Sequence, residues 1–287
     1  MKGILLAGGS GTRLYPATMA ISKQLLPVYD KPMVYYPLSL LMLAGIREVL
    51  LISTPQDISR FESLLGNGSD WGIKIEYKVQ NKPEGIAQAF ILAKEFLDGQ
   101  PSCLVLGDNV LYGAQLEDRL VQASKINKGA CIFAYVVSDP ERYGVVVFDK
   151  SGKVTHIEEK PKTPISKYAI PGIYFYDSRA PEVASRLKPS PRGELEITDL
   201  NKFYLDEGTL NVLQLGRGYA WLDMGTFDSL LDASEYIAVI ERRQSLKVAC
   251  LEEIAYRNKW ISKKEVLSKA DKLGKTKYAD YLRALEF

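Results

Sequence analysis

The chain has 287 residues, of which 46% are hydrophobic and 25% are charged, and its formal net charge is only +2. A chain of this length can bury one large α/β core, and its balanced charge argues against nucleic-acid partners, which require a strong positive field. No apolar run approaches the length of a membrane span, and the N-terminal run is too short for a secretory signal, so we expect a cytoplasmic protein without membrane partners.

The first half of the chain alternates strand-like apolar runs with segments typical of helices. Strands are predicted at residues 4–7, 49–52, 73–79 and 103–106, and helices at residues 31–44, 59–65 and 85–97. Gly45 follows the first of these helices, where a glycine often ends a helix. Strands that alternate with helices predict a parallel, doubly wound sheet.

From about residue 130 the pattern changes to strands joined by short turns. Strands are predicted at residues 131–137, 144–148, 154–158, 172–176, 210–215 and 220–222, a loop at 189–193 and a helix at 196–207. From residue 226 onward the chain is almost entirely helical. We therefore predict an α/β fold with a doubly wound, mostly parallel, Rossmann-like sheet, an inserted β-rich region and a C-terminal helical extension.

The same pattern predicts two units. Residues 1–225 would form the α/β unit, with one half at 1–110 and a second half at 111–225. Residues 226–287 would form an appended helical segment, because this stretch has no glycine loop and no acidic pair at a strand end. The segment could serve assembly or regulation, or its helices could simply cover the sheet. The sequence alone leaves both readings open.

A glycine-rich loop follows the first strand directly. Residues 8–13 are Gly-Gly-Ser-Gly-Thr-Arg, and such glycines let the backbone turn sharply while its N–H groups form a nest for an anion. Arg13 and Lys23 add positive charge, so the stretch indicates a polyphosphate site. The dinucleotide fingerprint is incomplete because Leu14 replaces its third glycine, and the Lys-Ser/Thr pair of a Walker A loop is missing. An ordinary strand-to-helix turn remains the alternative.

The longer string is more specific than its glycines. G-G-S-G-T-R-L-x-P-x-T, followed by S-K-Q-L-L-P-V, resembles the signature of the sugar-nucleotidyltransferase family, and the resemblance covers nearly the whole chain. Within that family the chain is most similar to the branch that joins dTTP and glucose 1-phosphate into dTDP-glucose and pyrophosphate, the first step toward dTDP-rhamnose. The resemblance implies Mg²⁺ as cofactor, a nucleotide-binding half at 1–110 and a sugar-phosphate-binding half at 111–225.

The resemblance also implies which residues hold the nucleotide. Arg13 and Lys23 would offset the charge of the departing pyrophosphate. The amide of Gln80 can both donate and accept, which suits thymine or uracil, and Gly85 would let the backbone approach the base. Because one methyl group gives only ~1–3 kcal/mol of discrimination, we expect partial use of UTP. The predicted nucleotide-binding residues are Leu6, Gly8, Gly9, Ser10, Gly11, Thr12, Arg13, Gln24, Gln80, Pro83, Gly85 and Asp108.

Two aspartates lie at the ends of predicted strands that are far apart in the chain. Asp108 stands in L-V-L-G-D-N and Asp223 in W-L-D-M-G-T. Ligands of open α/β sheets bind beyond the carboxyl ends of strands, and two carboxylates there can share a divalent cation. Taken singly, either aspartate could be a turn or helix-capping residue. The resemblance implies that both are magnesium ligands and that Asn109 faces the sugar.

A charged cluster, Glu-Glu-Lys-Pro, occupies residues 158–161. Such a run is usually a solvated face. The resemblance implies instead that Glu159 binds sugar hydroxyls, that Lys160 holds the sugar phosphate, and that Arg192 adds a forked contact to it. Arg13, Lys23, Lys160 and Arg192 are thus the predicted catalytic cations. The predicted sugar-binding residues are Asn109, Tyr143, Gly144, Glu159, Lys160, Ile170, Tyr174, Arg192 and Trp221; Tyr174 and Trp221 could equally be core aromatics.

Histidine and cysteine chemistry contributes little here. His156 is the only histidine and lies in a strand-like stretch, so we expect it to be structural. The three cysteines are far apart and lack metal-binding spacing, which indicates buried free thiols.

The rival functions are a uridylyl- or adenylyltransferase of the same family and a regulator that binds nucleotide sugars without turnover. A binder has no need for both metal carboxylates, so Asp108 and Asp223 favour the enzyme.

The helical tail is rich in aromatic and aliphatic residues. Contiguous apolar surface usually marks an interface, and the resemblance implies a homotetramer built as a dimer of dimers. It also implies inhibition by the end product of the pathway at a site between subunits. We predict that Arg217, Tyr256 and Arg257 belong to that allosteric site, since an arginine fork suits a diphosphate. Either arginine could instead pair with a carboxylate of its own helix.

Overall fold

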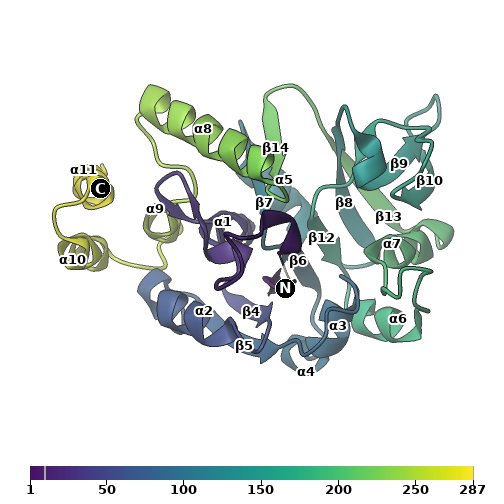
Figure 1. Cartoon of the computed structure of the whole chain (residues 1–287), viewed down its shortest axis with the longest axis horizontal. Coiled ribbons are helices and arrows are strands. Elements are labelled where there is room, and N and C mark those ends of the chain that lie inside the picture. Colours follow the sequence, from purple (N-terminus) through teal and green to yellow (C-terminus); the bar gives the residue numbers. More distant parts are fainter. Residues whose placement is uncertain (10, 287) are drawn as a thin grey trace.

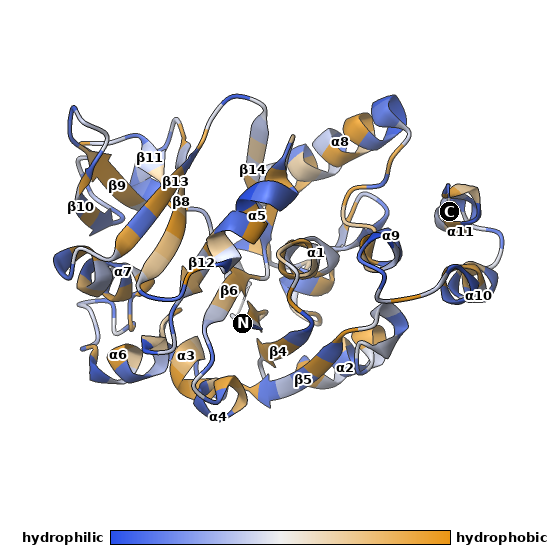
Figure 2. Ribbon diagram, turned by 180° about the vertical axis from the view of Figure 1, so that it is seen from behind, coloured by the Kyte–Doolittle hydropathy of each residue, from blue (hydrophilic) through white to orange (hydrophobic). Residues whose placement is uncertain are grey.

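A computed structural model describes residues 1–9 and 11–286, and its centre is a ten-stranded mixed sheet with helices on both faces (Figure 1). Ser10, one of the predicted nucleotide contacts, lies outside the described residues. The strand order is β10-β9-β11-β8-β12-β6-β1-β4-β5, and β13 pairs with β8. Hydrophobic colour runs along the central strands in Figure 2, as expected for a sheet covered on both faces.

Four parallel strands form the first half of the sheet. They are β1 (Lys2–Leu6), β4 (Glu48–Ser53), β5 (Lys74–Val79) and β6 (Ser102–Leu106). Leu5 pairs with Leu51 on one side and with Val105 on the other. Ile4 and Leu5 are both fully buried and belong to the cores on opposite faces. The predicted parallel arrangement of this half is confirmed.

The second half joins the first in antiparallel fashion, through β12 beside β6. Its strands are β8 (Ala130–Val136), β9 (Gly144–Phe148), β10 (Val154–Glu159), β11 (Tyr168–Ala169), β12 (Ile173–Tyr176) and β13 (Leu210–Leu215). All pair antiparallel except β13, which runs parallel to β8. The β-rich second half is therefore as predicted, and the α/β class of the whole sheet is confirmed.

In the described part of the chain, seven α-helices cover the sheet, and two of the predicted helices differ from expectation. The helices that cover the sheet are α1 (Tyr35–Leu43), α2 (Ile58–Leu65), α3 (Gln88–Leu92), α4 (Lys94–Leu97), α5 (Leu116–Ser124), α6 (Ala180–Arg186) and α7 (Ile197–Asp206), and α8 follows. The helix predicted at 31–44 begins only at Tyr35, because β2 (Pro27–Val28) and β3 (Lys31–Pro32) form a small hairpin before it. The helix predicted at 85–97 is interrupted at Ala93 and starts at Gln88.

A short two-stranded ribbon lies beside the main sheet. It consists of β7 (Asn109–Gly113) and β14 (Tyr219–Asp223), which run antiparallel and pair Asn109 with Asp223. The strand β7 and the helices α5 and α6 were not predicted. The ribbon matters for function because β7 begins directly after Asp108, so Asp223 is brought beside the end of β6.

The tail consists of α8 (Phe227–Gln244), α9 (Leu251–Arg257), α10 (Lys263–Leu273) and α11 (Lys277–Ala284), with α10 and α11 at the end of the molecule opposite β9 and β10 (Figure 1). Much of its apolar content packs internally: Ile237 and Leu282 are fully buried. Tyr278 and Tyr281 donate hydrogen bonds to the buried carboxylates of Glu252 and Glu253. Among the described helices, none has the length and apolarity to cross a membrane.

Candidate active site

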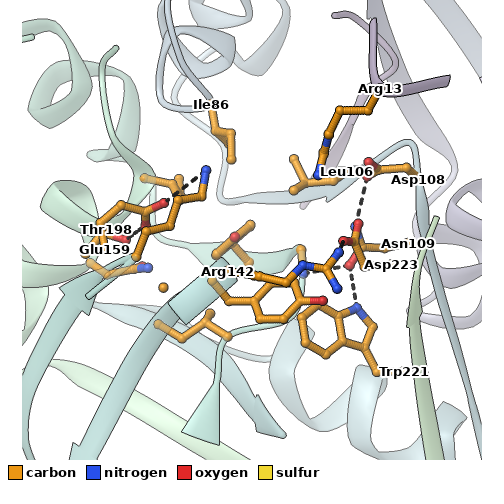
Figure 3. A pocket seen from close by; sticks show the side chains of 18 residues that line it. Arg13, Ile86, Leu106, Asp108, Asn109, Arg142, Glu159, Thr198, Trp221 and Asp223 are labelled. Carbon is orange, nitrogen blue, oxygen red and sulfur yellow. Dashed lines mark hydrogen bonds and ion pairs between the residues drawn. The ribbon is translucent and has the colours of Figure 1, made fainter. Parts of the chain in front are cut away.

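A cavity of about 430 Å³ opens where β6 meets the second half of the sheet. In Figure 3, Glu159 and Thr198 lie across this cavity from Arg13 and Asp108, and Arg142 lies between them. We call it the sugar-side cavity. Eleven residues predicted from the sequence line it: Arg13, Asp108, Asn109, Tyr143, Gly144, Glu159, Lys160, Ile170, Tyr174, Trp221 and Asp223.

A second cavity, of about 210 Å³, is formed by the glycine-rich loop, and we call it the loop cavity. Predicted residues on its lining are Gly8, Gly9, Gly11, Thr12, Arg13 and Lys23. Gly9 and Gly11 have φ angles of 103° and 59°, a backbone conformation that favours glycine. Arg13 lines both cavities.

Buried polar contacts hold the glycine loop in place. Thr18 donates its hydroxyl to the carbonyl oxygen of Gly11 at 2.7 Å, and the amide of Gln24 donates to the carbonyl oxygen of Gly8 at 3.2 Å. Gln24 is 2% exposed and, like Leu6 at the end of β1, lines neither cavity. The structure thus gives Gln24 and Leu6 supporting positions behind the loop rather than an open approach to a ligand.

Asp108 is ion-paired with Lys23 and accepts a hydrogen bond from the amide of Asn109 at 3.0 Å. Burial acts to raise the pKa of Asp108, but the charge and hydrogen bond of Lys23, with help from Asn109, hold that pKa below its ordinary value. Asp108 is therefore ionised at neutral pH. The ion pair joins the loop cavity, through Lys23, to the sugar-side cavity.

The pKa of Asp223 is shifted in the direction opposite to that of Asp108. Burial, followed by the negative charge of Asp108, raises its pKa above the ordinary value, although Lys23, Arg142 and Arg13 act against the shift. The two carboxylates therefore lie close enough to repel each other. Within residues 1–9 and 11–286, no cluster of three or more His, Cys, Asp or Glu could hold a metal by itself. Two hard oxygen donors of like charge fit a divalent cation whose remaining ligands are phosphate and water.

At the other side of the sugar-side cavity, Glu159 accepts a hydrogen bond from the hydroxyl of Thr198. Lys160 has a φ of 43°, rare for a residue with a side chain, and its backbone N–H donates to the carbonyl oxygen of Tyr143 at 3.0 Å. Its ammonium lies 3.9 Å from the carboxylate of Glu159. The backbone conformation of Lys160 and its contact with Glu159 together place this cation on the lining of the cavity.

Arg192 does not line the sugar-side cavity, and its contact with a sugar phosphate stays a prediction. Its guanidinium lies 2.8 Å from Glu196, 3.3 Å from Glu194 and 3.5 Å from Glu159. These three carboxylates therefore pair with the Arg192 guanidinium. Arg142, which was not predicted, lines the cavity, and its guanidinium lies 3.4 Å from Asp223 and 2.7 Å from Asp139. Its place directly before the predicted pair Tyr143-Gly144 was the only available signal.

Asn109 and Trp221 form the floor of the sugar-side cavity. The side-chain oxygen of Asn109 accepts from the indole of Trp221 at 2.6 Å and from the backbone of Gly172 at 3.0 Å. The side-chain oxygen of Asn109 is thus already occupied by protein donors. The ring of Tyr143 lies 4.8 Å from that of Trp221, and burial raises the pKa of Tyr143 to about 12, so the phenol stays neutral. Further lining residues that were not predicted are Ile86, Leu106, Gly172, Ile197, Thr198 and Asn201.

The predicted base-reading segment lies beside the glycine loop. Gln80 is 3% exposed, and a Cβ on Gly8 would lie 2.6 Å from its side-chain oxygen. At Gly85, which is predicted to let the backbone approach a base, a Cβ would lie 2.4 Å from the carbonyl oxygen of Leu195. The glycine is therefore required by the packing of two loops. Pro83 is exposed and lines neither cavity.

A third cavity, of about 490 Å³, lies between the end of β7 and α9. Of the predicted allosteric residues only Arg257 lines it, and its guanidinium pairs with Glu253 of the same helix at 2.6 Å. Arg217, on the turn between β13 and β14, and Tyr256 do not line it.

His156 is half exposed and lines none of the three cavities. Cys103, Cys131 and Cys250 are buried free thiols, as expected.

Comparison with known proteins adds an independent line of information. A family model described as nucleotidyl transferase matches residues 2–239. The glucose-1-phosphate thymidylyltransferase of Xanthomonas campestris pv. campestris (strain B100) is 57% identical over 99% of this chain and 96% of its own length. That of Neisseria gonorrhoeae is 56% identical over 98% of each chain. A Bacillus anthracis protein assigned as a glucose-1-phosphate thymidylyltransferase, solved with sucrose, superposes with a TM-score of 0.76, 40% identity, and coverage of 82% of this chain and 94% of that one.

Proposed function

The chain belongs to the nucleotidyl transferase family, and we propose that it transfers a thymidylyl group from dTTP to glucose 1-phosphate, giving dTDP-glucose and pyrophosphate. The curated relatives of this family, named as thymidylyltransferases, match it over nearly their whole length. The observation that carries the proposal is Arg13, which lines both the loop cavity and the sugar-side cavity. A triphosphate on the glycine loop and a sugar phosphate in the larger cavity meet beside this cation.

The reaction joins two anions, so its problem is electrostatic. A phosphate oxygen of glucose 1-phosphate attacks the α-phosphorus in line; a new P–O bond forms, the bond to the β-phosphate breaks, and its electron pair leaves with pyrophosphate. A phosphate monoester with a second pKa of ~6 is already mostly dianionic at neutral pH, so no general base is required. Arg13 and Lys23 offset the charge of the leaving pyrophosphate, and Lys160 that of the attacking phosphate.

We propose Mg²⁺ as the cofactor, held by Asp108 and Asp223. When bound, it supplies positive charge to the reacting phosphates. Lys23 keeps Asp108 ionised, and Arg142 and Arg13 favour the ionised form of Asp223. Glu159 and Thr198 orient the hexose, while the rings of Tyr143 and Trp221 exclude water. In this scheme Arg142 lies on the lining of the cavity together with Arg13, whereas Arg192 would first have to leave Glu196.

The test is pyrophosphate release, measured with each nucleoside triphosphate against a panel of sugar 1-phosphates. We expect the highest kcat/KM for dTTP with glucose 1-phosphate and partial activity with UTP, because the missing methyl group gives only ~1–3 kcal/mol of discrimination. A clear preference for UTP or ATP would establish a different member of the family. Binding of dTDP-glucose without any turnover would establish a non-catalytic regulator.

We also propose that the third cavity is a second site for a nucleotide sugar. Lys247 and Arg257 are the cations on its lining. Lys247 is paired with Asp30 and Glu241 and Arg257 with Glu253, so a bound diphosphate would have to replace these carboxylates. We expect Arg257→Ala to weaken inhibition by dTDP-rhamnose at least about tenfold, because a charge-assisted hydrogen bond contributes roughly 1.5–3 kcal/mol. Turnover without inhibitor should stay nearly normal, as it should in the control Arg243→Ala. Purely competitive inhibition, unchanged in Arg257→Ala, would leave the active site as the only nucleotide site.

For the tail, residues 226–287, we propose a role in assembly. The apolar side chains that remain exposed on it lie mainly on α8, where Phe227, Leu231 and Val239 are 48%, 58% and 47% exposed. These positions follow one another every four or eight residues, so they share a helix face. We expect sedimentation at micromolar concentration to show a homotetramer, and Leu231→Glu to shift it toward smaller species. A monomeric wild-type chain would contradict the proposal.

A further inference from the structure

Gln80, the expected base-reading residue, is held by a chain of side-chain hydrogen bonds. Its amide nitrogen donates to the side-chain oxygen of Gln88 at 2.6 Å. Its backbone N–H donates to the carbonyl oxygen of Ser53 at 2.7 Å, so the residue is anchored at both ends. A glutamine amide has a donor face and an acceptor face, and which of them a ligand meets depends on which one the protein occupies.

The orientation of the Gln88 amide is determined twice over. The backbone N–H of Glu84, which can only donate, lies 3.1 Å from the side-chain oxygen of Gln88. The carboxylate of Glu84, which when ionised can only accept, receives the Gln88 side-chain nitrogen at 2.7 Å. Both contacts require the Gln88 oxygen to face the backbone of Glu84 and Gln80. That oxygen can be met only by a donor, so Gln80 must present its nitrogen to Gln88.

The oxygen of Gln80 is consequently turned the other way, toward the glycine loop. A Cβ on Gly8 would lie 2.6 Å from it, so Gly8 makes room for this oxygen without needing a left-handed backbone. No described residue donates a hydrogen bond to the Gln80 oxygen. Gly8 itself lines the loop cavity, so an unpaired acceptor stands at the edge of the proposed nucleotide site.

We propose that Glu84 and Gln88 are positioning residues for base selectivity: they fix Gln80 as a hydrogen-bond acceptor toward the incoming base. This inference rests on the proposed use of dTTP. An acceptor at this place selects a base whose pairing edge offers an imino N–H between two carbonyls, as in thymine and uracil. Cytosine presents a bare ring nitrogen at the same position, and two acceptors facing each other leave both unsatisfied.

The test is the substitution Gln88→Lys, which reverses the direction of the hydrogen bond between residue 88 and Gln80. A lysine can pair with Glu84 but only donates, so it turns the Gln80 oxygen toward itself and the Gln80 nitrogen toward the base. We expect the ratio of kcat/KM for dTTP to that for dCTP to fall about tenfold or more, since an unsatisfied buried polar group costs roughly 1–3 kcal/mol. Gln88→Glu is made together with Glu84→Gln, so that an amide still donates to the new carboxylate and two carboxylates do not face each other. This variant keeps an acceptor toward Gln80 and should retain the wild-type ratio.

The ratio of dTTP to dUTP is the internal control, because the two bases differ only by a methyl group and share the imino N–H. It should be the same in wild type, Gln88→Lys and the double variant. An unchanged dTTP to dCTP ratio in Gln88→Lys, or an equal loss of that ratio in the double variant, would overturn the inference. Should Gln88→Lys not fold, Gln88→Leu, which frees the Gln80 amide to rotate, must still lower the ratio. Failure of the proposed function appears separately, as a wild-type enzyme that does not prefer dTTP.

Discussion

Asp223→Asn is expected to lower kcat by about 100- to 1,000-fold, the range typical for removing one electrostatic group from a reacting centre. The substitution keeps the volume of the side chain and removes one of the two carboxylates proposed to hold Mg²⁺. Turnover should be measured across a magnesium titration, since a weakened site is partly rescued by more metal, whereas a lost role in orientation is not.

The same substitution should leave the melting temperature unchanged or slightly higher. Burial and the neighbouring charge of Asp108 both disfavour the ionised form of Asp223, so its replacement by a neutral amide removes an unfavourable term from the folded state. Asp206→Asn, at the exposed end of α7, is the matched control and should change neither quantity. Near-normal turnover of Asp223→Asn with magnesium would show that Asp223 is not a metal ligand.

Lys160→Ala is expected to raise KM for glucose 1-phosphate and to lower kcat, together reducing kcat/KM by roughly 100-fold, because a charge-assisted contact to phosphate of 1.5–3 kcal/mol is lost. KM for dTTP should hardly change. Lys160 lies on the side of the cavity that carries Glu159, away from the glycine loop. Initial rates with each substrate varied in turn separate the two effects.

Lys162→Ala is the control for Lys160→Ala, since Lys162 is exposed, close in sequence and absent from the lining of the cavity. It should behave like wild type with both substrates. If Lys160→Ala lost affinity for dTTP instead, the lysine would belong to the triphosphate side, and the assignment of residues 111–225 to the sugar phosphate would have to be revised.

The local features were predictable because they depend on neighbours in sequence. The glycines of residues 8–11 follow a buried strand, and the structure gives Gly9 and Gly11 the positive φ angles such a turn needs. The strands at 49–52 and 103–106 also appeared where apolar runs predicted them. Two elements were missed for an equally local reason. Most residues of α5 are polar, and the apolar run Val-Leu-Tyr of β7 is too short to indicate a strand before its partner β14 is known.

Long charged side chains, in contrast, find partners that lie far away in the chain. Arg192 was expected at the phosphate, but three glutamates hold its guanidinium outside the cavity. Arg142 occupies the cavity because β14 brings Asp223 to it, across 81 positions of sequence. The close approach of the Leu195 backbone to Gly85 could likewise not be predicted, because Leu195 lies 110 positions away in the chain.

By itself, then, the sequence determined the chemistry that is available: a glycine loop beside Arg13 and Lys23, carboxylates at Asp108 and Asp223, and a Glu-Lys pair at residues 159 and 160. Only the tertiary structure decided which of these groups act together. The antiparallel ribbon of β7 and β14 sets Asp223 beside Asn109, and the like charge of Asp108 then raises the pKa of Asp223. The reason is physical: backbone preference and side-chain chemistry belong to a residue, whereas burial, ion pairing and the orientation of an amide such as Gln80 belong to what surrounds it.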